Sequence, residues 1–265
     1  MSEATHLDRI IAAKRAELSA HRGDGVISAR QLEQALAGLP PVRDFEGALR
    51  QGPAPRIIAE FKRASPSAGP IREDADVAQI VSAYEKAGAT AISVLTDRHF
   101  DGRLADLEAA RAATSLPILR KDFILDRSQI LEARRAGADA VLLIAAVLEA
   151  PLLKQLIDFA HDLSLHVLCE AHDGHEVDRA LSAGATLVGV NNRDLKSFEV
   201  DRSVAISQRA RVPRSFTFVA ESGIEGPEHL RQLRDAGVDA ALVGTLFMGA
   251  EDPGAALASV LEALA

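Results

Sequence analysis

One short phrase occurs four times in this chain, and its spacing constrains the fold more than any other feature. The copies are Lys-Ala-Gly-Ala-Thr at 86–90, Arg-Ala-Gly-Ala-Asp at 135–139, Ser-Ala-Gly-Ala-Thr at 182–186 and Asp-Ala-Gly-Val-Asp at 235–239, with their glycines 49, 47 and 53 residues apart. Each copy ends a helical pattern and precedes a short apolar run, and a glycine just past a helix end takes the left-handed conformation that terminates the helix. A (β/α)8 barrel uses about 250 residues for eight strand–helix units, so two units take roughly 60 or fewer. The phrase therefore marks every second unit of such a barrel.

The other strands fall between the marked ones. The eight predicted strands cover 56–60, 91–95, 116–119, 140–144, 165–170, 187–190, 216–221 and 240–243. Helix-period segments between them include 75–86, 128–135, 151–163 and 227–235, with Pro151 and Pro227 expected at the first helical position. Strands that alternate with helices indicate a parallel sheet, and eight of them favour closure. We predict an α/β protein with a (β/α)8 TIM barrel; the alternative is an open, doubly wound sheet.

About fifty residues precede the first strand. Leu7, Ile10, Ile11 and Leu18 share one face of a predicted helix, and Ser28 with Gln31 resembles a capping box. Because such helices need an apolar partner, we expect 1–50 to be an N-terminal helical extension packed on the barrel. Residues 1–265 then form a single domain.

Composition limits the partners of the chain. It has 265 residues, 48% of them apolar, and a formal net charge of −8, which argues against nucleic acid or an anionic membrane surface but not against a small anionic molecule. The start has no basic segment followed by an apolar one, so we expect no secretory signal. The single cysteine, Cys169, cannot form an internal disulfide, which fits a reducing cytoplasm. No protein partner is indicated.

Charged and polar side chains gather at the predicted carboxyl ends of the strands, where barrel enzymes carry their chemistry. Seven groups lie there: Glu60, Lys62, Lys121, Glu170, Asn191, Arg193 and Glu221. Any one of these residues alone is typical of a strand end exposed to solvent. Together they indicate a site, because burying charge without partners is costly.

The loops after the last two strands carry a second signal. Ser222 and Gly223 follow the seventh strand, and Gly244 and Thr245 follow the eighth. Glycines let backbone N–H groups approach an anion, and barrel enzymes often bind phosphate in these two loops. Ser65, after the first strand, can add a hydroxyl.

Two other signals favour ordinary structure. His172 and His175 have metal-like spacing, but no third ligand stands out, so we interpret them as a loop or helix start and expect no metal. Cys169 is adjacent to Glu170 and should point to the opposite side, toward the helices, as a small core residue.

At this point the motifs closely resemble the indole-3-glycerol-phosphate synthase family. The matching strings are Ile-Ala-Glu-Phe-Lys-Arg-Ala-Ser-Pro-Ser at 58–67, Ile-Ser-Val-Leu-Thr at 92–96, Leu-Arg-Lys-Asp-Phe-Ile at 119–124, Glu-Ala-His-Asp at 170–173, Val-Asn-Asn-Arg-Asp-Leu at 190–195, Ala-Glu-Ser-Gly-Ile at 220–224 and Val-Gly-Thr-Leu-Phe-Met at 243–248. The opening Leu-Asp-Arg-Ile-Ile-Ala-Ala-Lys-Arg at 7–15 is similar too, so the resemblance covers nearly the whole chain.

The resemblance implies ring closure, decarboxylation and dehydration of 1-(2-carboxyphenylamino)-1-deoxyribulose 5-phosphate to indole-3-glycerol phosphate, a carboxy-lyase reaction of tryptophan biosynthesis, with no cofactor. Lys121 is then the principal general acid, and Glu170 handles a proton in the later elimination. How Lys121, Glu170 and Lys62 divide the dehydration stays open.

The remaining roles follow from the same resemblance. Lys62 also holds the substrate carboxylate, and Glu60 orients and balances the lysines. Asn191, Arg193 and Glu221 organise the sugar hydroxyls. The phosphate and the aryl ring are bound by the last group of residues: Ser65, Ser222, Gly223, Gly244 and Thr245 for the phosphate, and Phe123 for the ring.

Two positions depart from the family pattern, and two other functions remain open. Phe100 is the one aromatic residue in a loop that is shortened here, and Thr245 stands where the family often has Ser or Glu. The alternatives are a phosphoribosyl isomerase-like barrel and a catalytically silent barrel that binds phosphorylated ligands. The first leaves the lysines of strands one and three unexplained.

Overall fold

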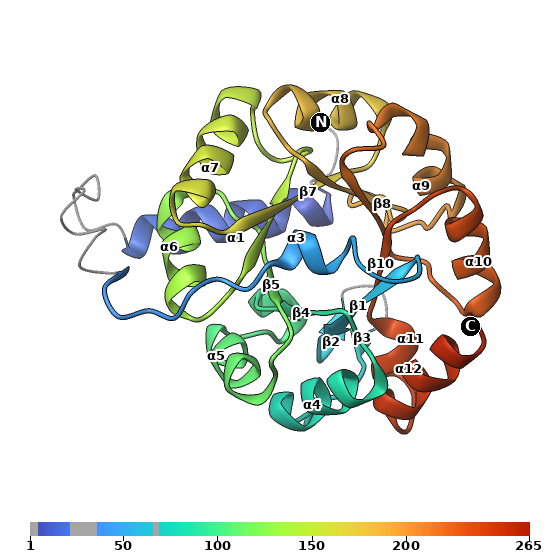
Figure 1. Cartoon of the computed structure of the whole chain (residues 1–265). Helices are drawn as coiled ribbons and strands as arrows, with labels where there is room; N and C mark the ends of the chain where they lie inside the picture. Colours follow the sequence, from blue (N-terminus) through green and yellow to red (C-terminus); the bar gives the residue numbers. More distant parts are fainter. Residues whose placement is uncertain (1–4, 22–35, 66–68) are drawn as a thin grey trace.

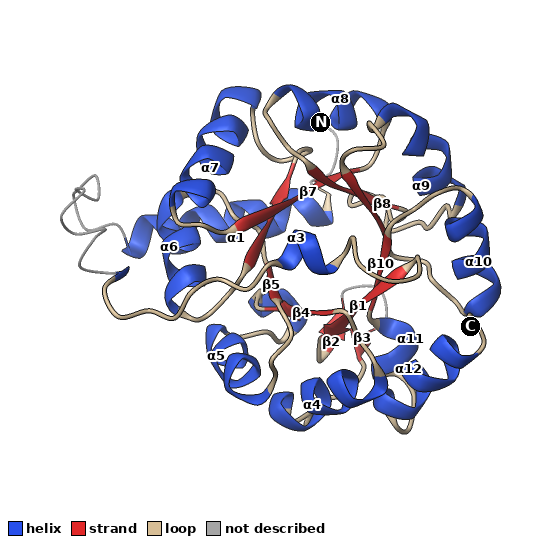
Figure 2. Cartoon of the chain, viewed as in Figure 1, coloured by secondary structure: helices blue, strands red, loops and turns tan. Residues whose placement is uncertain are grey.

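A closed barrel of eight parallel strands forms the centre of the molecule, ringed by helices (Figures 1 and 2). The structure is a computed structural model that describes residues 5–21, 36–65 and 69–265. The barrel strands are β1 (Arg56–Phe61), β4 (Ala91–Leu95), β5 (Ile118–Lys121), β6 (Ala140–Ile144), β7 (His166–Ala171), β8 (Leu187–Asn191), β9 (Thr217–Glu221) and β10 (Ala240–Val243). Each strand pairs with the next along the chain, and β1 closes the ring against β10 with Ala59 opposite Val243. This confirms the predicted barrel over the open sheet.

Helices follow the strands as the phrase spacing predicts. They are α4 (Val77–Ala87), α5 (Leu104–Ala113), α6 (Arg127–Arg135), α7 (Ala150–Asp162), α8 (Gly174–Ser182), α9 (Ser203–Gln208), α10 (Pro227–Asp235), α11 (Thr245–Met248) and α12 (Pro253–Glu262). Short pieces complete the described chain: 3-10 turns η1 (Arg98–Phe100) and η2 (Arg209–Arg211), and the strand pair β2 (Ala64–Ser65) and β3 (Gly69–Pro70).

The four repeated glycines end their helices as predicted. Gly88, Gly137, Gly184 and Gly237 all have φ between +79° and +100°, a region that costs other residues energy. Pro227 is the first residue of α10, as expected. Pro151 is the second residue of α7 and not the first, because the helix begins one residue earlier at Ala150.

Two apolar layers hold the barrel together. Alternate strand residues point outward to the helices or inward to the axis, so that Cys169 joins the outer layer and Leu168 the inner one. The larger side chains that the strands supply to the inner layer are Ile58, Leu119, Leu142, Ile144, Leu168, Leu187, Val219 and Leu242. It is completed by residues from outside the barrel.

The N-terminal segment supplies those residues at both ends of the barrel axis. Phe45 and Leu49, in and just after α3 (Phe45–Ala48), are fully buried in the inner layer, and Figure 1 shows α3 across the middle of the ring. From α1 (His6–His21), Leu7, Ile10 and Ile11 pack into the same layer. Each such burial contributes about 1.5–3 kcal/mol. The predicted capping box at 28–31 lies outside the described residues.

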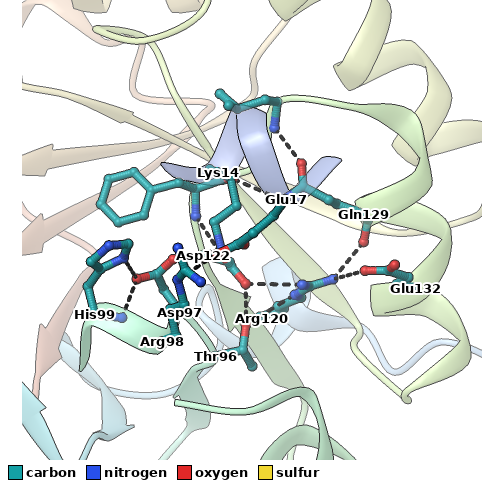
Figure 3. Close-up of polar contacts among 12 residues, drawn as sticks. Lys14, Glu17, Thr96, Asp97, Arg98, His99, Arg120, Asp122, Gln129 and Glu132 are labelled. Carbon is teal, nitrogen blue, oxygen red and sulfur yellow. Dashed lines mark hydrogen bonds and ion pairs between the residues drawn. The ribbon is translucent and has the colours of Figure 1, made fainter. Parts of the chain in front are cut away.

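A buried ion pair also fixes α1 beside the carboxyl ends of β4 and β5 (Figure 3). Lys14 Nζ lies 2.6 Å from Asp97 Oδ2 and 2.9 Å from Asp122 Oδ1. Asp122 is also held by Arg120, at 3.0 Å, and by the Thr96 hydroxyl, which donates at 2.6 Å. Because Asp122 directly follows Lys121, this cluster fixes one strand end of the candidate site.

In the described part of the chain, no helix is both long and apolar enough to cross a membrane.

Candidate active site

A cavity at the carboxyl ends of the strands brings together all thirteen residues that the sequence analysis assigned to a site. It encloses about 930 Å³, open mouth included. Those thirteen residues are Glu60, Lys62, Ser65, Lys121, Phe123, Glu170, Asn191, Arg193, Glu221, Ser222, Gly223, Gly244 and Thr245. Further lining residues that sequence reasoning did not assign are Leu95, Phe100, Asp122, Leu142, Ile144, Leu195, Phe198, Ile224, Leu242 and Val243.

Lys121 lies between two buried carboxylates at the centre of the cavity. Its Nζ is 3.1 Å from Glu170 Oε2 and 2.9 Å from Glu221 Oε2. Lys121 and Glu221 are the last residues of β5 and β9, and Glu170 is the penultimate residue of β7, so parallel strands that are not neighbours bring them together. Both carboxylates are only 1% exposed, and Glu221 Oε1 has no hydrogen-bond partner within the described residues.

The charges of this trio shift one another's protonation. Burial alone would lower the pKa of Lys121, but Glu170, Glu221 and Glu60 raise it above its ordinary value, so the ammonium is retained. Burial would raise the pKa of Glu170, yet Lys121 and His172 hold it well below its usual range. For Glu221, burial and the nearby Glu170 charge outweigh Lys121 and raise the pKa to about 7. Two adjacent carboxyl groups thus differ in proton affinity.

Glu60, in β1, and Lys62, just after this strand, form a second pair that lines the cavity. Lys62 Nζ lies 2.8 Å from Glu60 Oε1, and Glu60 is 3% exposed. The close approach of Gly244 makes room for this pair, because a Cβ there would lie 2.4 Å from Glu60 Oε1. Gly189, in the middle of β8, does the same for Glu221, with a Cβ 2.2 Å from its Oε1. Sequence reasoning missed Gly189, although a glycine inside a strand signals close approach.

One wall of the cavity is apolar and aromatic. The rings of Phe100 and Phe123 stack with centroids 6.4 Å apart and an interplanar angle of 27°. The Phe123 backbone N–H donates to Asp122 Oδ1 at 2.8 Å, so the Lys14 cluster also positions this wall. Phe100, in the loop where the sequence departs from the family pattern, therefore faces the cavity with Phe123.

The opposite side is polar and rich in turns. The Arg193 backbone N–H donates to Asn191 Oδ1 at 3.0 Å, and its guanidinium donates to the Phe198 carbonyl at 2.9 Å. Ser222 and Gly223 both take left-handed conformations, with φ of +62° and +70°. A Cβ on Gly223 would lie 2.6 Å from Val200, so this turn requires glycine. The sequence analysis assigned Ser222 and Gly223 to a phosphate, and Asn191 and Arg193 to sugar hydroxyls.

His172 is a polar neighbour that sequence reasoning set aside. The helix start was predicted correctly, because Asp173 caps α8. The ring itself lies with Nε2 3.3 Å from Glu170 Oε1 and Nδ1 3.0 Å from Glu176 Oε2, whereas His175 is exposed. The available signal was its position two residues after Glu170, which places both side chains on one side of an extended segment. The part of the chain that the structure describes holds no group of three His, Cys, Asp or Glu arranged to bind a metal.

Cys169 has the surroundings expected of a core residue. It is fully buried in the outer apolar layer, and burial raises the pKa of its thiol to about 12. A thiol in this state is a poor nucleophile.

Comparison with known proteins places these features in a family. The profile of the family described as indole-3-glycerol phosphate synthase matches residues 7–260. A protein of that name from Burkholderia vietnamiensis (strain G4 / LMG 22486) is 48% identical over 95% of this chain and 97% of its own length. Another from Mycolicibacterium smegmatis (strain ATCC 700084 / mc(2)155) is 45% identical over 99% of this chain and 96% of its own length.

Solved structures at low identity share the fold. A 3-hexulose-6-phosphate synthase superposes with a TM-score of 0.64 at 15% identity, covering 80% of this chain and 100% of that one. A thiamine phosphate pyrophosphorylase from Pyrococcus furiosus gives a TM-score of 0.60 at 19% identity, covering 79% and 95%.

Proposed function

The chain belongs to the indole-3-glycerol phosphate synthase family, and we propose that Lys121, Glu170 and Lys62 carry the proton transfers of its reaction. It is a carboxy-lyase of tryptophan biosynthesis that converts 1-(2-carboxyphenylamino)-1-deoxyribulose 5-phosphate into indole-3-glycerol phosphate, CO2 and water. The observation that carries the assignment of roles is Lys121, held at about 3 Å from two buried carboxylates inside the cavity at the carboxyl ends of the strands.

The two sides of the cavity suit the two ends of this substrate. The carboxyphenyl ring packs against Phe123 and Phe100, with its carboxylate at the Lys62 ammonium. The phosphate occupies the polar side, between the turns at Gly223 and Gly244. The hydroxyl-binding and phosphate-binding groups are then Asn191, Arg193 and Glu221 for the sugar chain, and Ser65, Ser222 and Thr245 for the ester.

Ring closure needs an acid. The arene carbon that bears the carboxylate attacks the ketone carbon, and a carbon–carbon bond forms as the carbonyl oxygen takes a proton from Lys121. The bond to the carboxylate then breaks, its electron pair returns to the ring, and CO2 leaves. Lys121 suits the first transfer because its neighbours keep it protonated.

Dehydration needs a base and an acid. A proton leaves the carbon beside the ring nitrogen, the new hydroxyl leaves as water, and the indole double bond forms. Glu170 suits the base because Lys121 and His172 keep it ionised. Lys121 and Lys62 both line the cavity and can supply the acid, and Glu60, 2.8 Å from Lys62, orients Lys62. No metal or organic cofactor enters this scheme.

The direct experiment uses the absence of tryptophan from the chain. Indole-like fluorescence that appears when the purified protein meets the carboxyphenylamino substrate must come from product. A phosphoribosyl isomerase-like barrel would give isomerised sugar phosphate and no such signal. A silent binding barrel would bind the substrate and leave it unchanged, and either result would overturn the proposal.

We further propose that the protein acts in the reducing cytoplasm on a small phosphorylated substrate, without nucleic acid, membrane or protein partner. The unpaired, buried Cys169 and the net charge of −8 support this setting.

A further inference from the structure

A row of buried, ion-paired side chains begins in the cavity and extends past its wall. Five side chains follow one another, with alternating charge: Glu221, Lys121, Glu170, His172 and Glu176. The nitrogen–oxygen distances between successive members are 2.9, 3.1, 3.3 and 3.0 Å. The first three members line the cavity, whereas His172 does not. It faces a separate surface hollow with Asn192 and Asp194, and its side chain is 13% exposed.

Carboxylates flank the His172 ring on both sides. Glu176 Oε2 accepts from the His172 backbone N–H at 2.8 Å and contacts ring Nδ1 at 3.0 Å. On the other side, ring Nε2 lies 3.3 Å from Glu170 Oε1, an ion-pair contact without hydrogen-bond geometry. Two flanking carboxylates favour the charged form of the ring, an imidazolium.

We propose that His172 is a positioning residue, which holds the Glu170 carboxylate ionised and turned toward Lys121 during the reaction. The inference rests on the role proposed above for Glu170. Glu170 has two oxygens, and each has one cationic neighbour: Lys121 on Oε2 and His172 on Oε1. Glu176 holds the His172 ring from the far side. The Glu170 carboxylate therefore has a cation on each side, and its Oε1 is paired with His172.

The charged groups around the pair agree with this role. Glu170 is faced by Lys121 from β5, by Glu221 from β9 and by His172 beyond β7. His172 is faced by Glu170, by Glu176 from α8, and at longer range by Asp194 beyond β8. Burial would lower the pKa of His172, but Glu170 and Glu176 raise it to about 10, so the ring stays charged across the working range.

Steady-state kinetics of His172→Gln between pH 4.5 and 8.5 test the proposal. Loss of the cation raises the pKa of Glu170, so the base becomes protonated as the pH falls. An opposite charge at this distance moves a pKa by about 1–3 units, and because the pKa of Glu170 starts well below its usual range, the loss of kcat is confined to the lowest pH values and should reach at most about tenfold relative to wild type at pH 4.5. At pH 8.5 kcat should stay within about twofold of wild type, and KM should stay within about twofold throughout because His172 does not line the cavity.

Two further variants complete the design. Glu176→Gln removes the carboxylate that holds the His172 ring and should show the same loss of kcat at low pH, to a smaller extent. This variant tests the proposal by itself if His172→Gln does not fold. His175→Gln removes the exposed histidine three residues away and should match wild type at every pH. A loss that is equal at all pH values, or a higher KM with unchanged kcat, would overturn the inference.

Glu170→Gln separates this inference from the role on which it rests. If Glu170→Gln keeps wild-type kcat, the proposed role of Glu170 is wrong. If Glu170→Gln is inactive and His172→Gln has a wild-type pH profile, only the role of His172 is wrong.

Discussion

Two lysines in this molecule have nearly the same surroundings and different consequences. Lys14 lies between Asp97 and Asp122, and Lys121 lies between Glu170 and Glu221, with Nζ–O distances from 2.6 to 3.1 Å. The clusters are also adjacent in sequence, since Asp122 follows Lys121. Lys14 nevertheless attaches a helix to the barrel, whereas Lys121 faces a cavity.

The difference lies in what else the carboxylates bind. Every carboxylate oxygen of the Lys14 cluster has a hydrogen bond or an ion-pair contact: Asp122 accepts from Thr96, Arg120 and the Phe123 backbone N–H, and Asp97 accepts from His99 through Oδ1 and lies 2.6 Å from Lys14 through Oδ2. In the Lys121 cluster, Oε1 of Glu221 has no hydrogen-bond or ion-pair partner among the described residues. A saturated pair stabilises a fold, and an unsaturated one beside a cavity keeps protons and oxygens available for substrate.

Lys121→Met should show the largest effect, and on activity. Removal of a general acid costs typically 10²–10⁴-fold, so we expect kcat to fall about 10³-fold. Binding of the product, measured by calorimetry, should change only a few fold, because the ring and phosphate contacts remain. The free energy of unfolding should fall by less than in the next variant, since water from the cavity can solvate the released carboxylates. A kcat within tenfold of wild type would contradict the assignment.

Lys14→Met should reverse that order, with a large effect on stability and a small one on kcat. Removal of one partner from a buried ion pair leaves uncompensated charge, so the free energy of unfolding should fall by about 3 kcal/mol in urea titrations. Lys154→Met is the matched control: Lys154 pairs with Asp158 at 2.9 Å on the surface, and its loss should cost less than about 0.5 kcal/mol.

The same titration tests the prediction that residues 1–265 form a single domain. One cooperative transition is expected for wild type and for Lys14→Met, because α1 contributes to the inner layer of the barrel. Separate unfolding of α1 would contradict it.

The positions of the strands could be predicted from the sequence because the signals that mark them are local. Helix-ending glycines and short apolar runs are local signals, so strand bounds were right to within about two residues; 91–95, 140–144 and 240–243 match their strands end to end. The cavity residues could be collected because carboxyl ends of parallel strands meet on one face.

The partners beyond those strand ends could not be predicted. Lys14 meets Asp97 and Asp122 only because α1 docks beside β4 and β5, a contact across about 100 residues that no local pattern encodes. The neighbours of His172 depend on where α8 begins and on which way the ring turns. Both are tertiary facts.

Glu221→Gln should change stability in a way that depends on pH, which sharpens the comparison. The pKa of Glu221 is raised from 4.5 to about 7, so the native state keeps a proton that the unfolded chain has released. This stabilisation is complete below pH 4.5 and is lost as the pH rises from there through 7, by about 3 kcal/mol. Asp122 behaves oppositely. Burial would raise its pKa, but Arg120 and Lys14 outweigh burial and lower it, so its stabilisation is present above pH 3.8 and is lost only as the pH falls below that value.

Urea unfolding at pH 4.5, 6 and 8 tests this difference. The free energy of unfolding of Glu221→Gln should rise relative to wild type as the pH rises, while that of Asp122→Asn should stay below wild type by a constant amount. Parallel curves for wild type and Glu221→Gln would mean that Glu221 is ionised throughout and that the two lysine clusters do not differ in this respect.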